Sequence, residues 1–90
     1  MKTLLPHIRI GKNQTGRVIL QIDDYELLDF IVDYLVERFS ISYETIDEQN
    51  NSNGRIFTIE FPIEITIEKI ELCLSDLSYS VIEKIYDINN

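Results

Sequence analysis

The chain has 90 residues, 44% of them hydrophobic, and its 16 acidic residues against 8 lysines and arginines give a net charge of −8. This length supports one domain with a modest core, which we take as residues 1–90. No apolar run reaches the roughly 20 residues that cross a bilayer, and the excess of carboxylates disfavours direct binding to nucleic acid, whose phosphates it repels.

Two local features indicate a cytoplasmic location. The apolar run near the N-terminus is shorter than the roughly 7–15 residues of a signal-peptide core. Cys73 is the only cysteine, so no internal disulfide can form, which agrees with a reducing compartment. We therefore expect a cytoplasmic protein without a membrane segment.

The charge is distributed unevenly along the chain. The first 17 residues carry four of the eight cations and no acid, whereas from Val18 onward 16 acids meet four cations, a balance of −12. Such a surface attracts a basic partner and speeds the encounter. Excess carboxylate also keeps a small domain soluble without any partner, and both interpretations stay open at this point.

The predicted elements, in chain order, are a short strand at 7–10, a buried strand at 17–22, a helix at 23–39, two strands of a hairpin at 40–48 and 55–61, a helix at 66–78 and a last strand at 79–88. Alternating or β-branched apolar residues indicate the strands, and apolar residues at every third or fourth position indicate the helices. The segment after Pro62 fits both patterns, but its helical repeat is longer and Thr66 is a suitable N-cap.

Two of these elements have strong local signals. In the helix at 23–39, Leu27, Ile31 and Leu35 recur on one side, and Asp23 or Asp24 can cap its first turn. In the hairpin, Asn53-Gly54 is the dipeptide that favours a tight type I′ turn. The order from Arg17 onward is therefore strand, helix, strand, strand, helix, strand.

Two right-handed crossover units in this order place an antiparallel sheet under two helices. The layout resembles the ferredoxin-like βαββαβ two-layer sandwich of the α+β class, with residues 7–10 as an extra N-terminal strand. The resemblance concerns only the order of the elements.

The sequence contains no motif for catalysis, a metal or another cofactor. His7 and Cys73 are the only members of their residue types, and Cys73 lies on the apolar side of the second predicted helix, where a buried thiol is the ordinary outcome. Residues 49–60 match part of a calcium-binding loop, but Gln49 stands at the first ligand position, and a hairpin turn explains the segment more simply. We expect no enzyme activity, no cofactor and no metal.

An acidic stripe is the most distinctive surface feature. Four carboxylates fall within an arc of roughly 80° opposite the apolar side of the helix at 23–39, and two aromatic residues border them. Rings among carboxylates suit an interface with lysine and arginine. The predicted partner-binding residues are Glu26, Asp29, Phe30, Asp33, Tyr34 and Glu37 on this helix, with Asp47 and Glu48 in the hairpin as a second patch.

In size, charge and architecture the chain resembles the small acidic immunity proteins of bacterial toxin–immunity systems, such as those of contact-dependent growth inhibition. The resemblance implies that the protein, as a monomer or homodimer, binds and neutralises a basic, nuclease-type toxin domain by imitating the charge of its substrate. The alternative is a small-ligand-binding or dimeric regulatory module of ferredoxin-like fold, which rests on analogy between folds.

Overall fold

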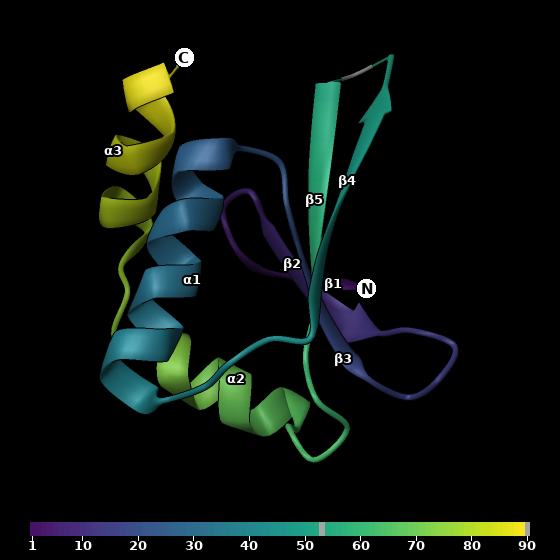
Figure 1. Ribbon diagram of the computed structural model, residues 1–90. Coiled ribbons are helices and arrows are strands. Elements are labelled where there is room, and N and C mark those ends of the chain that lie inside the picture. Colours follow the sequence, from purple (N-terminus) through teal and green to yellow (C-terminus); the bar gives the residue numbers. More distant parts are fainter. Residues whose placement is uncertain (53, 90) are drawn as a thin grey trace.

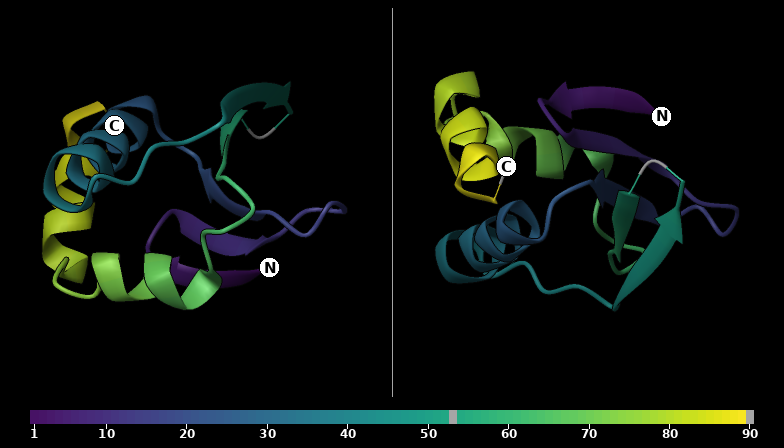
Figure 2. Two further views of the ribbon diagram at one scale, coloured as in Figure 1. Left: turned by 60° about the horizontal axis from the view of Figure 1, so that its bottom comes forward. Right: turned by 90° about the horizontal axis from the view of Figure 1, so that it is seen from above.

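The computed structural model describes residues 1–52 and 54–89, and these residues form two layers, a twisted antiparallel sheet and a set of helices that cover one face of it (Figures 1 and 2). In chain order the elements are β1 (Lys2–Leu5), β2 (Ile8–Lys12), β3 (Val18–Ile22), α1 (Tyr25–Phe39), β4 (Thr45–Asn51), β5 (Gly54–Glu60), α2 (Ile67–Leu74) and α3 (Tyr79–Asn89). The expected α+β class is confirmed.

The sheet has the strand order β1-β2-β3-β5-β4, so β1 and β4 are its two edges. One row of cross-strand partners runs from Ile10 through Leu20 and Ile59 to Ile46. The first three side chains are buried under the helices, whereas Ile46 on the edge strand is 38% exposed. The helical layer therefore leaves the β4 side of the sheet partly uncovered.

The opposite face of the sheet is polar. The neighbouring row of partners runs from Arg9 through Gln21 and Thr58 to Asp47. No helix of the described chain covers this face (Figure 2). Because successive residues of a strand point to opposite faces, polar residues alternate here with the buried aliphatic ones.

Helix α1 forms where the sequence predicts it. Asp24 is its N-cap, accepting a hydrogen bond of 3.0 Å from the backbone N–H of Leu27. Ser40, in the left-handed conformation, ends the helix by donating its backbone N–H to the carbonyls of Leu35 and Val36. Helix α2 likewise begins after its predicted cap, since Thr66 accepts from the N–H of Lys69.

The predicted last strand at 79–88 is wrong, because this segment is helix α3. Ser78 caps it, with its hydroxyl 3.2 Å from the N–H of Val81. Ile82 is fully buried, and Ile85 packs against the same core one turn later. The N-terminal hairpin β1–β2 extends the sheet beside β3 instead, so the ferredoxin-like order is not confirmed.

The strand boundaries differ from the prediction in two other places. Strand β1 has no counterpart among the predicted elements, and β4 begins at Thr45 instead of residue 40. The turn at the end of α1 folds the chain back, so that Ile41 is buried in the core. The predicted turn dipeptide includes Asn53, which lies outside the described residues, while Gly54 has a φ of +120° that suits glycine.

Candidate functional site

The acidic stripe lies on the side of α1 that faces away from the core. Its four carboxylates are exposed, while Leu27, Ile31 and Leu35 on the opposite side are buried. Within residues 1–52 and 54–89, none of these four side chains forms a hydrogen bond or an ion pair. The stripe therefore projects carboxylates that form no ion pair within the described part of the chain.

The stripe is electrostatically unfavourable for the isolated helix. Asp29, Asp33 and Glu37 follow one another at intervals of four residues, so their carboxylates are neighbours on the helix surface. Like charges at this spacing destabilise a helix by a few tenths of a kcal/mol per pair. The burial of the other side of α1 offsets this repulsion.

One flank of the stripe is an aromatic hollow beside the α2–α3 connection. It is lined by Phe30, Asp33, Tyr34, Glu37, Arg38 and Leu77. The rings of Phe30 and Tyr34 are stacked with their centroids 5.9 Å apart. The guanidinium of Arg38 lies 5.3 Å from the centre of the Tyr34 ring, so this flank is already occupied in part by a cation of the protein itself.

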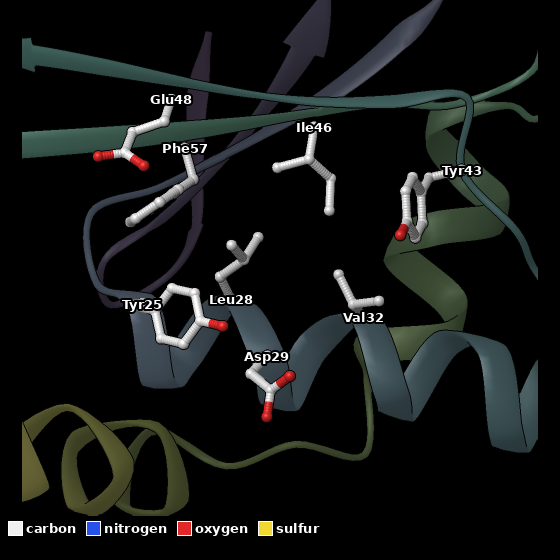
Figure 3. A pocket seen from close by; sticks show the side chains of 8 residues that line it. All are labelled: Tyr25, Leu28, Asp29, Val32, Tyr43, Ile46, Glu48 and Phe57. Carbon is white, nitrogen blue, oxygen red and sulfur yellow. The ribbon is translucent and has the colours of Figure 1, made fainter.

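The other flank of the stripe is a groove between α1 and the β4–β5 hairpin, with a volume of about 330 Å³ (Figure 3). We call it the α1–β4 groove. Its lining residues are Tyr25, Leu28, Asp29 and Val32 from α1, Tyr43 from the following connection, and Ile46, Glu48 and Phe57 from the hairpin.

The interior of the α1–β4 groove is apolar and open. Leu28, Val32 and Ile46 point toward one another across it (Figure 3). Tyr25 and Tyr43 are 53% and 42% exposed. The Tyr25 ring makes an edge contact with Phe57, with the ring centroids 6.0 Å apart. The groove thus offers apolar area that a partner could remove from water.

Carboxylates stand at the rim of this groove on both sides. Asp29 points away from the strands on the α1 side, and Glu48 extends from β4 on the other (Figure 3). Glu48 lies 3.4 Å from the guanidinium of Arg55, and that guanidinium lies 5.5 Å from the centre of the Phe57 ring. This end of the groove therefore already holds a guanidinium between an aromatic ring and a carboxylate.

The structure divides the predicted partner-binding residues into several places. Asp29 and Glu48, from the two predicted patches, stand on opposite sides of the α1–β4 groove. Phe30, Asp33, Tyr34 and Glu37 line the opposite flank of α1, and Glu26 is exposed in its first turn. Asp47 does not join Glu48, because neighbouring residues of β4 point to opposite faces of the sheet.

Sequence reasoning missed the residues that make the groove. Tyr25, Val32 and Ile46 look like ordinary core positions, and only the distance between α1 and β4 leaves them open to solvent. No local pattern in the sequence distinguishes these three side chains from buried ones.

The described residues also bear on a metal site, a reactive thiol and a membrane-spanning helix. They contain no group of three or more His, Cys, Asp or Glu side chains placed to hold a metal ion. Burial raises the pKa of the Cys73 thiol, against a smaller lowering by Lys69, so the thiol is protonated and unreactive at neutral pH. None of the helices described is long and apolar enough to cross a bilayer.

Comparisons with known proteins found no family model, no curated protein and no solved structure that matches the chain.

Proposed function

We propose that this protein binds and neutralises a basic protein, as immunity proteins neutralise toxin domains. The observation that carries the proposal is the pairing of two features on α1. Its outward carboxylates have no cation partner among the described residues, and an exposed apolar groove runs along the same helix.

The two features suit different stages of association. Unpaired surface carboxylates attract a positively charged partner from a distance and orient it. Apolar side chains that become buried, such as Ile46 and Tyr43, then supply the short-range affinity that charge at the rim does not. A nuclease-type domain carries cations for its phosphate substrate, so an acidic protein can occupy the same site.

A pair of charge-reversal variants tests this proposal. The first double variant reverses two charges of the stripe, by Asp33→Lys and Glu37→Lys. The control double variant reverses two exposed acids outside the stripe, by Glu64→Lys and Asp87→Lys. Each reversal adds two positive charges, so both double variants carry −4 in place of −8. Any difference in binding between them reflects the location of the charge and not the total.

The partner to test is a basic toxin domain, sought first in the neighbouring reading frames. The measurement is affinity for that domain, together with survival of cells that express it. We expect the stripe variant to lose more than about 1–2 kcal/mol of binding free energy and to stop protecting cells. The control variant should lose far less. Equal affinity of the two variants at low salt would show that the stripe is not the binding surface.

The alternative, a small-ligand or dimeric regulatory module, has less support. It depended on the ferredoxin-like arrangement, and the observed strand order differs from that arrangement. The α1–β4 groove is open, and its two carboxylates, Asp29 and Glu48, stand on opposite sides of its rim instead of converging on one point inside it.

A further inference from the structure

The two edges of the sheet are protected to very different degrees. Strand β1 is four residues long, carries Lys2 and has an irregular register between Thr3 and Leu5. Shortness, a lysine and a bulge are ordinary protections against strand pairing. The edge at β1 is therefore poorly suited to accept another strand.

Strand β4 lacks these protections. It is seven residues long, pairs with β5 without a register shift, and contains neither lysine nor proline. Its residues 45–50 are all exposed. Half of the backbone N–H and C=O groups of such an edge point away from the sheet, where another strand can pair with them.

The α1–β4 groove lies directly beside this edge. Ile46 and Glu48 point from β4 to the groove side, and Val32 faces them from α1 (Figure 3). A strand added to β4 would continue the sheet across the mouth of the groove. Since strand side chains alternate, every second side chain of that strand would lie over the groove.

The charge around this edge favours a basic strand over a second copy of β4. Asp47 and Glu48 lie on β4, and Asp29 lies across the groove. Two copies of this chain paired through β4 would bring these carboxylates together, which costs free energy. A strand that carries lysine or arginine would instead place opposite charges together.

We propose that an extended segment of the partner, with lysine or arginine alternating with apolar residues, adds to β4 as a further strand. Its backbone pairs with the free edge of β4, its apolar side chains enter the α1–β4 groove, and its cations, on the opposite face of the sheet, lie beside Asp47. This is recognition by β-augmentation, in which main-chain hydrogen bonds supply affinity and pockets for alternate side chains supply specificity. The inference rests on the proposed function, because it specifies how the basic partner is held.

Three synthetic peptides test it with the unmodified protein. The parent is a seven-residue peptide of alternating lysine and valine, matched to the length of β4. One derivative is N-methylated at every valine and the other at every lysine. In a strand, these two sets of N–H groups point to opposite sides, so only one derivative loses the hydrogen bonds to β4.

We expect the parent to bind at low salt, to shift the amide signals of residues 45–50, and to slow their hydrogen exchange. One methylated derivative should bind at least about tenfold more weakly, because it loses every hydrogen bond between its N–H groups and β4. The other derivative should match the parent. Equal binding of both derivatives, equal loss by both, or signal changes confined to α1 would overturn strand addition. Dimerisation of the protein through β4 would overturn it as well.

Substitutions in the protein provide a matched control. Ile46→Lys places a cation in the groove at the edge strand, whereas Ile63→Lys makes the same change at an isoleucine that is 56% exposed and outside the groove. Only the first should abolish peptide binding. If the parent peptide fails to bind while the basic partner still does, strand addition is wrong and the proposed function stands.

Discussion

The ring of His7 lies flat against the ring of Tyr86, with their centroids 3.6 Å apart and their planes 3° from parallel. The two imidazole nitrogens lie near carboxylates, Nδ1 at 3.4 Å from Asp23 and Nε2 at 3.2 Å from Glu83. His7 belongs to the β1–β2 turn, Asp23 precedes α1, and the other two residues are on α3. One side chain thus joins three separate parts of the fold.

We predict that His7→Ala lowers the free energy of unfolding by about 1–3 kcal/mol, because it removes the ring contact and both carboxylate contacts. His7 also has a φ of 66°, a left-handed conformation that asparagine tolerates better than alanine. His7→Asn is therefore the control, and it should be the less destabilised of the two. Urea denaturation measures both, and an unchanged midpoint for His7→Ala would contradict the prediction.

A second prediction concerns the docking of α3. Ile82 is fully buried and Ile88, on the same helix, is 73% exposed. Ile82→Ala should cost about 2–4 kcal/mol of unfolding free energy, since it leaves a cavity in the core. Ile88→Ala should change stability by less than about 0.5 kcal/mol. Similar effects of the two substitutions would mean that α3 does not pack as described.

A third prediction separates stability from binding at the stripe. Asp33→Lys turns two repulsive pairs, with Asp29 and Glu37, into attractive ones four residues apart. We expect the free protein to gain up to about 1 kcal/mol in unfolding free energy at low salt, while affinity for the basic partner falls. The gain should shrink at high salt because surface charges are screened.

Glu64→Lys serves as the control for that substitution. Glu64 is exposed and lies in the connection between β5 and α2, outside any helix. The reversal there should leave both stability and affinity nearly unchanged. If Asp33→Lys destabilised the protein, the carboxylate would have a structural role that the geometry does not reveal.

A fourth prediction follows from the buried thiol of Cys73. Burial raises the pKa of Cys73 above its ordinary value of 9.0, with Lys69 lowering it by a smaller amount. Well below pH 9 the thiol is protonated in both the folded and the unfolded chain, so its contribution to stability is complete. As the pH rises, the thiol of the unfolded chain ionises before that of the folded chain. The contribution to stability therefore falls, and it is lost once the pH has passed the folded pKa.

Two measurements check this expectation. A thiol reagent at pH 8 should react slowly with the native protein and quickly in urea. The free energy of unfolding of the unmodified protein should fall as the pH rises above about 9, and Cys73→Ala should make that fall smaller. Fast reaction under native conditions would show that Cys73 is accessible.

Several elements follow from the sequence by itself. The apolar side of α1, its cap at Asp24 and the cap of α2 at Thr66 are local patterns, because the residues that create them are neighbours along the chain. Strand β3 and the hairpin strands were predicted for the same reason. The acidic stripe is also a local property, since the spacing of its residues alone places them on one side of a helix.

Other features depend on contacts between distant segments. The sequence of residues 79–89 alternates as in a strand but also contains Ile82 and Ile85 at helical spacing. The segment is a helix because these two side chains pack against the core and Ser78 caps the first turn. Strand β1 is too short to have a pattern, and only its pairing with β2 makes it a strand. The α1–β4 groove exists because the helices cover the sheet as far as β5 and leave its edge open. Periodicity states which side of an element is apolar, but only the tertiary arrangement determines whether another element covers it.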